Sequence, residues 1–336
     1  MLNLAAPPLT GLTAWLVAWL TPPPSPPPLE RPHLADLAQA DYPLPAFVRA
    51  CPVAQKYRDL LGALDWANFP ERPANRAWPG SPPHPRAPFV AAYLVKLHEG
   101  KTYMSDLREF LLEHPALVWL LGFDLVADPT AAHGFDLAAS VPSRKQFGRV
   151  LRDLDNAAGQ FLLTSTVQLI AEHLPPEVRF GEHISLDTKH IVAWVKENNP
   201  KAYVKESDRL NKHRQPKGDR TCKLGCKKRR NDAPGPELSA AAQPAPVSPV
   251  NHRPTNFSHL DVYYWGYASG LVATKVPGYG EFVLAELTQT FDQADISYFF
   301  PLMTATAQRL GRPPRFGALD AAFDAFYVHV RRLTTA

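Results

Sequence analysis

The chain has 336 residues, enough for two domains that each bury a core. Its three cysteines argue against a disulfide framework and indicate a reducing compartment, so we expect a cytoplasmic protein. The formal net charge of +4 is unevenly distributed, because residues 196–230 hold thirteen Lys or Arg against four Asp or Glu. Such a basic segment suits a polyanion such as nucleic acid, although a solvated loop is the ordinary alternative.

The chain begins with an apolar stretch at residues 9–20 (LTGLTAWLVAWL). It is too short to cross a bilayer and follows no basic residue, which argues against a membrane span and a signal peptide. A partly buried helix that ends at Pro22–Pro28 (PPPSPPP) is the better expectation. We therefore treat residues 1–43 as a Pro-rich N-terminal segment and expect no membrane partner.

From about Phe89 to Leu174 the apolar residues have the spacing of helices. Phe89 to Leu97 and Leu107 to Leu111 each place apolar side chains on one face. Ser143 to Gln146 (SRKQ) resembles a capping box that opens a long helix. The expected apolar stripe of that helix is Phe147, Val150, Leu151 and Leu154.

The other face of this helix is basic. Four cations lie on it: Arg144, Lys145, Arg149 and Arg152. They can meet DNA phosphates in a helix-turn-helix arrangement, and a solvated helix face is the alternative.

From residue 181 the apolar period changes from that of a helix to that of a strand. Residues 181–195 (GEHISLDTKHIVAWV) predict one long strand or a bent pair, with Asp187 in its middle. Residues 196–257 follow as a basic insertion, whose Pro- and Ala-rich part from residue 233 to residue 254 we expect to be flexible or disordered.

Order is expected to resume with a hairpin and a helix. Residues 262–274 and 282–287 predict two strands joined by the turn PGYG. A helical run from residue 295 to residue 310 follows, which we expect to break near Pro301. The last strand, residues 316–320, ends in Asp320.

This order suggests a purpose for the two aspartates. If their strands are neighbours, about 4.8 Å apart, Asp187 and Asp320 converge near one edge of the sheet. Close carboxylates repel each other, and a bound Mg²⁺ or Mn²⁺ ion usually offsets this repulsion. Such an ion can support phosphodiester cleavage. Lys189 lies on the same strand face as Asp187 and can steady a phosphate, or it is simply a surface lysine.

Several blocks together resemble the DDE transposases of bacterial insertion sequences, of the insertion-sequence-four type. They are SLDTKHIVAWVKENNPKAYV, CKLGCKKRRN and ALDAAFDAFYV, preceded by APFVAAYLVKLHEGKTYMSDLREFLLEHPALVWLLGF and SVPSRKQFGRVLRDLD. The resemblance implies α+β or α/β architecture: a helical N-terminal DNA-binding domain at residues 44–178, then an incomplete ribonuclease-H-like catalytic domain at residues 179–336. It also implies a cytoplasmic, nucleoid-associated protein and a possible homodimer.

Site residues follow from the same resemblance. Asp187 and Asp320 match the family's first and second metal-binding, catalytic aspartates, with Mg²⁺ or Mn²⁺ as cofactor. Asp324 fits a capping or supporting role better than that of a ligand. The expected DNA partners are the element's terminal inverted repeats and its target, with further contacts from Lys189, Lys223, Lys227, Lys228, Arg229 and Arg230.

The family pattern is incomplete at its third acid. After Asp324 the chain reads AFYVHVRRLTTA, with no Asp or Glu. We therefore expect a catalytic domain truncated before that residue and little strand transfer by this chain alone. We also expect apolar surface to be exposed at Phe323, Phe326 and Tyr327.

Other interpretations remain open. Cys222 and Cys226 can bind zinc with His213 and either His252 or His259, or they can be reduced thiols in a basic loop. His183 and His190 are expected to be packed or exposed rather than to bind metal. In function, a DNA-binding remnant without catalysis and a ribonuclease-H-like nuclease that only hydrolyses are the alternatives to a transposase.

Overall fold

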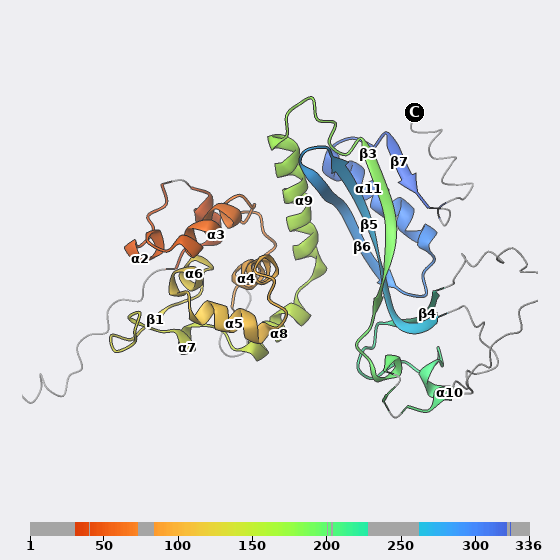
Figure 1. The fold of residues 1–336 in the computed structure, drawn as a ribbon, viewed down its shortest axis with the longest axis horizontal. Coiled ribbons are helices and arrows are strands. Elements are labelled where there is room, and N and C mark those ends of the chain that lie inside the picture. The colour runs from red at the N-terminus through yellow and green to blue at the C-terminus, as the bar shows by residue number, and fades with distance from the viewer. Residues whose placement is uncertain are drawn as a thin grey trace, which may run out of the picture. The chain divides into compact units, whose positions relative to one another are not determined.

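A computed structural model describes residues 31–39, 41–72, 84–199, 201–202, 204–227, 262–320 and 323 (Figure 1). The chain divides into two compact units, residues 1–165 and 166–336, and the division falls within helix α9 (Asn156–His173). Residues 9–28, the Pro- and Ala-rich part of the insertion, Lys228 to Arg230 and Asp324 lie outside the described residues, as do Phe326 and Tyr327.

The first unit is built mainly from helices. Its elements are η1 (Leu34–Ala38), α2 (Ala46–Arg49), α3 (Pro52–Gly62), α4 (Arg86–His98), α5 (Met104–Leu112), α6 (Pro115–Leu120), β1 (Val126–Ala127), β2 (Phe135–Asp136), α7 (Leu137–Ser140), α8 (Arg144–Asp153) and the first part of α9. The helices expected around Phe89 and Leu107 are thus confirmed as α4 and α5.

Aromatic packing centres the core of this unit on Phe89. Its ring contacts Phe123 and Phe147 edge to face, with centroids 5.3 Å away in both cases. The hydroxyl of Tyr93 donates a hydrogen bond to the Phe147 carbonyl oxygen at 2.7 Å. Phe147 belongs to α8, so this contact fixes which side of α8 faces the core.

Helix α8 begins as its sequence predicts but is shorter than expected. The Ser143 hydroxyl accepts a hydrogen bond from the Gln146 backbone N–H at 3.2 Å, which caps the helix. The helix ends at Asp153, and α9 starts anew at Asn156. The expected place of Leu151 in the apolar stripe is wrong, because α8 packs through Phe147 and leaves Leu151 47% exposed.

The second unit is a mixed sheet with a helix on one face, so the chain as a whole is α+β. Its strands are β3 (His183–Val192), β4 (Lys223–Lys227), β5 (Val262–Val276), β6 (Gly280–Thr290) and β7 (Phe316–Leu319). The sheet has the order β4-β5-β3-β7, and β6 pairs with β5. Only β3 and β7 are parallel among these pairs; β5 is antiparallel to β3, β4 and β6.

The sequence predicted β3, β5, β6, β7 and the hairpin turn, but not β4. Residues 183–192 form one continuous strand, and the β5–β6 hairpin turns between Val276 and Gly280, at the expected PGYG. The short elements η2 (Lys196–Asn198) and α10 (Glu206–Arg209), with β4, show that the first half of the insertion is ordered.

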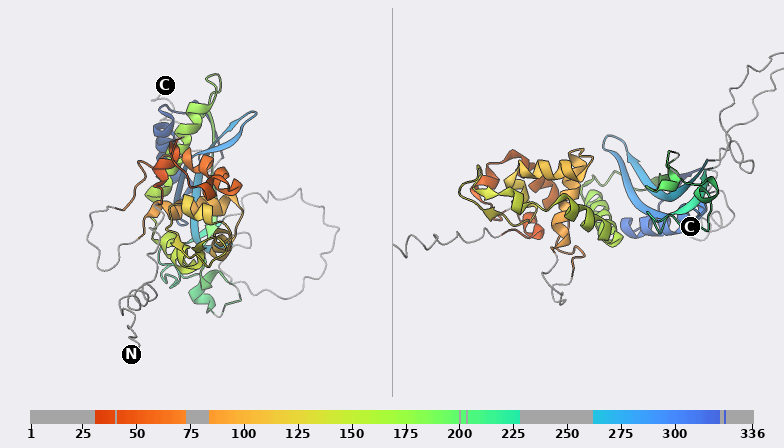
Figure 2. Two further views of the ribbon diagram at one scale, coloured as in Figure 1. Left: turned by 90° about the vertical axis from the view of Figure 1, so that its left-hand side faces the viewer. Right: turned by 90° about the horizontal axis from the view of Figure 1, so that it is seen from below.

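Helices η3 (Asp295–Tyr298) and α11 (Phe299–Leu310) cover one face of this sheet, as the view from below in Figure 2 shows for α11. The Tyr298 hydroxyl donates to the Ala268 carbonyl oxygen of β5 at 2.8 Å. A Cβ at Gly270 would lie 2.6 Å from Tyr298 and 2.8 Å from Leu302. Glycine at this position therefore allows the helix to approach the sheet closely.

The helical run from residue 295 to residue 310 is divided near Pro301, as expected, because η3 ends at Tyr298 and α11 begins at Phe299. Pro301 itself lies in the first turn of α11, where a backbone N–H has no partner within the helix. Another expectation about this unit is wrong. Phe323 is not left exposed but is 2% exposed, within the buried part of the protein.

No helix among the described residues is both long enough and apolar enough to cross a membrane.

Close packing of α11 on β5 makes Gly270 a sensitive position. We expect Gly270→Ala to lower the free energy of unfolding by about 1–3 kcal/mol, because the added methyl overlaps Tyr298 and Leu302. Gly218→Ala is the matched control, since its Cβ would meet only ordinary contacts, the nearest at 3.7 Å. Urea unfolding that gives equal stabilities for the two variants would contradict this packing.

Candidate metal and nucleic-acid site

The structure brings Asp187 and Asp320 to neighbouring positions on paired strands. The parallel register of β3 and β7 pairs Ser185 with Ala318 and Leu186 with Leu319. The next positions in this register are Asp187 and Asp320, the latter directly after β7. Strands β3 and β7 lie side by side in Figure 1. Neighbouring strands lie about 4.8 Å apart and their paired residues point to the same face, so the two carboxylates share one face of the sheet.

That face is opposite to the one covered by η3 and α11. Thr188, the residue after Asp187, pairs with Gly270 and donates its hydroxyl to Asp295 of η3 at 3.0 Å. Side chains alternate along a strand, so Asp187 and Lys189 point the other way, and both are exposed. The expectation that these two residues share a strand face is confirmed.

Local hydrogen bonds hold Asp187. The Thr188 backbone N–H donates to the Asp187 Oδ1 atom at 2.8 Å. Because the Thr188 side chain is itself held by Asp295, this short chain of contacts connects the covered face of the sheet to the carboxylate on the other face. The Asp320 side chain is exposed, and its carbonyl oxygen accepts from the Phe323 N–H at 3.1 Å.

Glu182 fixes the register in which the two aspartates meet. This residue precedes β3 and is only 6% exposed. Its carbonyl oxygen accepts from the backbone N–H groups of Arg315 and Phe316, at 3.0 and 2.9 Å, where β7 begins. Its carboxylate forms ion pairs with Arg179 and Arg315, each at 3.4 Å. Buried carboxylates need such partners, so Glu182 joins the starts of both strands.

A third carboxylate that the sequence did not single out lies on the same sheet face. In the register of β5, Leu271 pairs with Asp187 on one side and with Glu286 of β6 on the other. Glu286 accepts hydrogen bonds from Ser269 at 2.8 Å and Thr288 at 2.5 Å. It is two strands away from Asp187, roughly 10 Å. The register of the β5–β6 hairpin places Glu286 on this face, and the sequence alone does not give that register.

The histidines near the site pack against aromatic rings, as expected. His183 stacks on Phe316 with centroids 4.6 Å apart, and His190 lies 4.3 Å from Phe291. Burial lowers the pKa of His190; Lys227 adds to this lowering, whereas Asp295 and Asp187 oppose it. His190 therefore favours its neutral form in the folded protein.

The basic face of α8 is exposed in the first unit. Lys145, Arg149 and Arg152 follow one another at spacings of four and three residues, which places them on one side of the helix. All three are exposed, as is Arg144 near the start of the helix. The core contact of Phe147 lies on the opposite side, so a solvent-facing basic surface results.

The described part of the insertion is also basic. Its exposed cations are Lys196, Lys201, Lys205, Lys212, Arg214, Lys217, Arg220, Lys223 and Lys227. Lys223 and Lys227 lie on β4, whereas Lys228, Arg229 and Arg230 lie outside the described residues.

Side-chain contacts fasten the insertion to the sheet. The Tyr267 hydroxyl of β5 donates to the Asp219 carboxylate at 2.7 Å, and the Trp265 indole N–H donates to the Arg209 carbonyl oxygen at 2.7 Å. Burial raises the pKa of Asp219, but hydrogen bonds from Tyr267, Thr221 and Cys222 outweigh it and lower the pKa below its ordinary value. These contacts hold the backbone of the insertion, and with it the exposed cations, in place on the sheet.

Cys222 directly precedes β4, and Cys226 lies within this strand rather than in a loop. Cys222 is fully buried against Ala193, Val195 and Trp265, and this burial, with the nearby Asp219, raises the pKa of its thiol to about 11. His252 and His259 lie outside the described residues. Within the described ranges, no group of three or more His, Cys, Asp or Glu side chains gathers closely enough to hold a metal ion.

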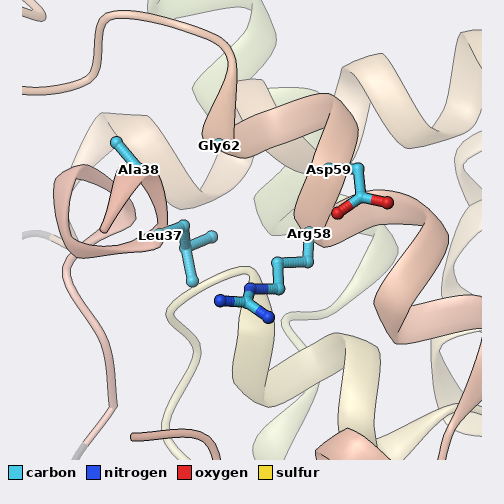
Figure 3. A pocket seen from close by; sticks show the side chains of 5 residues that line it. All are labelled: Leu37, Ala38, Arg58, Asp59 and Gly62. Atoms are coloured by element: carbon cyan, nitrogen blue, oxygen red, sulfur yellow. The ribbon is translucent and has the colours of Figure 1, made fainter. Parts of the chain in front are cut away.

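Two other features were not expected from the sequence. Trp194, placed by its pattern inside the buried strand, follows β3 and is 100% exposed. In the first unit, a shallow hollow lies between η1 and α3, lined by Leu37, Ala38, Arg58, Asp59 and Gly62 (Figure 3). The side chains of Arg58 and Asp59 point in different directions in Figure 3.

No family model, curated protein or solved structure matches the chain. The family resemblance therefore remains an expectation from the sequence.

The lowered pKa of His190 predicts a pH-dependent stability. Since the unfolded chain binds a proton on this histidine near its ordinary pKa of about 6.5, and the folded chain does so only at lower pH, stability falls as pH decreases from about 7 to 5.5. His190→Gln is expected to reduce this loss, whereas His183→Gln is expected to retain it. Urea unfolding of the three proteins at both pH values measures the difference; an unchanged loss in His190→Gln would contradict the assignment.

Proposed function

We propose that this chain is a DNA-binding protein of the insertion-sequence DDE transposase type, with a ribonuclease-H-like core that carries out metal-dependent phosphoryl transfer. The observation that carries the proposal is the parallel pairing of β3 with β7, which puts Asp187 and Asp320 at neighbouring positions. The blocks that resemble this family require adjacent aspartate strands separated in sequence by a hairpin and a helix. The order β3, β5, β6, α11, β7 meets that requirement.

The chemistry of the pair fits a hard divalent cation. Both side chains are exposed carboxylates on one sheet face, and carboxylate oxygens are the ligands that Mg²⁺ and Mn²⁺ prefer. Asp187 and Asp320 would hold the ion. When bound, such an ion polarises a phosphodiester and activates a water or a 3′-hydroxyl.

The residues around the pair prepare it for a phosphate. The Thr188 N–H restrains the Asp187 carboxylate through its Oδ1 atom and leaves the second oxygen of the group outside this bond. Lys189, two residues on and exposed, places a positive charge on the same face, where it can attract a phosphate oxygen. The chain thus supplies both negative ligands and a neighbouring cation.

DNA contacts are proposed for two basic surfaces, one in each unit. The first is the exposed face of α8 formed by Lys145, Arg149 and Arg152, and the second is the basic insertion from residue 196 to residue 227. When cations held by a fixed backbone contact DNA phosphates, counterions are released from the DNA. This release gives affinity that does not depend on the base sequence. Terminal inverted repeats and target DNA are the proposed partners, and a homodimer and a nucleoid-associated cytoplasmic location belong to the same proposal.

A non-catalytic DNA-binding protein is the second candidate. One observation favours it, which concerns the number of carboxylates near the pair. On this sheet face the described residues place two carboxylates, Asp187 and Asp320, at neighbouring positions, whereas the third, Glu286, lies two strands away from Asp187. A nuclease that only hydrolyses would use the same pair, and its products would be cut but never joined strands.

The metal assignment predicts the behaviour of two aspartate variants. We expect Asp187→Asn and Asp320→Asn each to weaken Mn²⁺ binding about tenfold or more, because each removes one anionic ligand. Titration with Mn²⁺, followed by the electron paramagnetic resonance signal of the free ion, measures the affinity. Glu281→Gln is the matched control, since it removes an exposed carboxylate of β6 that pairs with Lys275.

If the double variant Asp187→Asn, Asp320→Asn binds Mn²⁺ as tightly as the unaltered chain, the metal site is elsewhere and the catalytic proposal fails. DNA binding that persists in that variant then leaves the non-catalytic candidate. Products with joined strands would exclude the purely hydrolytic nuclease.

The proposed role of α8 predicts a change in salt dependence. We expect replacement of Lys145, Arg149 and Arg152 by Ala to reduce the slope of log K against log salt by roughly 3, because each phosphate contact contributes about 0.9. Lys56→Ala is the matched control in the same unit, because Lys56 is already paired with Glu99 at 3.0 Å. Fluorescence anisotropy with duplex DNA at several salt concentrations measures the slope. An unchanged slope in the triple variant would show that α8 does not touch DNA.

A further inference from the structure

Trp194 is a large apolar side chain that the fold leaves entirely in solvent. Its exposed fraction is 100%, whereas its neighbours Ala193 and Val195 are each 7% exposed. Tryptophan is highly buried on average in folded proteins, because its ring carries a large apolar area. A fully exposed indole between two buried residues is therefore open to a ligand that can cover it.

The backbone that carries this indole is held firmly. Ala193 donates its N–H to the Trp265 carbonyl oxygen at 2.9 Å. The Asn198 side-chain amide donates to the carbonyl oxygens of Ala193 and Trp265, at 2.8 and 2.7 Å, and accepts from the Trp265 N–H at 2.8 Å. Because both neighbours of Trp194 are packed in the core, the indole is presented from a fixed position with only its two side-chain torsions free.

Two exposed cations lie on the segments next to Trp194. Lys196 follows two residues later and is exposed. The loop at Gly218 lies against the same segment: a Cβ there would be 3.8 Å from the Trp194 carbonyl oxygen and 3.7 Å from Val195. Exposed Lys217 precedes this glycine, so positive charge reaches Trp194 from two parts of the insertion.

We propose that Trp194, with Lys196 and Lys217, is a stacking platform for an unpaired base of nucleic acid. This inference deepens the proposed function and rests on it. An exposed aromatic ring in a basic setting is what single-strand binding requires, because every base offers a flat face and every nucleotide brings a phosphate. An apolar protein partner suits the position less, since it would bury the neighbouring ammonium groups of Lys196 and Lys217 without neutralising them.

The platform also has a defined relation to the aspartate pair. Trp194 lies seven residues after Asp187 along the same segment, at most about 23 Å away at 3.3 Å per residue. A DNA strand that is bound at Asp187 can therefore reach Trp194 with a short single-stranded tail. The platform is expected to bind such a tail with little preference for base sequence.

The test compares two DNA probes and uses the full chain. One probe is a blunt duplex, and the other is the same duplex with a single-stranded tail. We expect Trp194→Ala to bind the tailed probe roughly 5- to 100-fold more weakly and the blunt probe as before, and we expect Trp194→Phe to restore most of the affinity. The substitution does not disturb the core, because the side chain is fully exposed. Val192→Ala, which shortens the 59% exposed last residue of β3, is the matched control.

Each outcome decides one part of the inference. A selective loss with the tailed probe that Phe restores supports the stacking platform. Equal affinities of Trp194→Ala and the unaltered chain for both probes overturn it, while the proposed DNA binding stands. A shift of Trp194→Ala from dimer to monomer in sedimentation, with tail binding unchanged, also overturns it, in favour of a contact between two copies of the chain. No binding of either probe by the unaltered chain ends both this inference and the proposed function.

Discussion

The parallel pairing of β3 with β7 is the constraint on which the candidate site depends, because strand side chains alternate between faces. A register shift of one residue would place Asp320 beside Leu186 or Thr188 and turn it to the face covered by α11. Glu182 opposes such a shift through its backbone bonds to Arg315 and Phe316 and its carboxylate pairs. The buried Glu182, to which we assign no catalytic role, therefore positions the two exposed aspartates.

The two faces of the sheet carry different groups. Tyr298 and Leu302 pack closely over Gly270 and anchor the covered face, which also holds His190 and Thr188. The opposite face carries Asp187, Lys189 and Glu286. Thr188 connects the faces, since its backbone holds Asp187 while its hydroxyl reaches Asp295. Packing on one side thus restrains a charged group on the other.

Local patterns in the sequence predicted what depends on neighbours along the chain. The alternation around Asp187, the PGYG turn and the cap at Ser143 all follow from short-range rules, and each is found where expected. Features that depend on distant partners were missed or wrong. Trp194 has the same apolar character as Val195, and only the docking of the insertion decides which of them is buried. Glu286 needed the hairpin register, and the burial of Phe323 needed tertiary contacts that no periodicity encodes.

The central claim is that Asp187 and Asp320 jointly hold a divalent cation on the open face of the sheet. An anomalous difference map from crystals of the full chain soaked in Mn²⁺ tests this most directly, because it locates the ion without assuming its ligands. We expect a peak within bonding distance of carboxylate oxygens from both residues. A peak elsewhere in the second unit, with none at this pair, would contradict it.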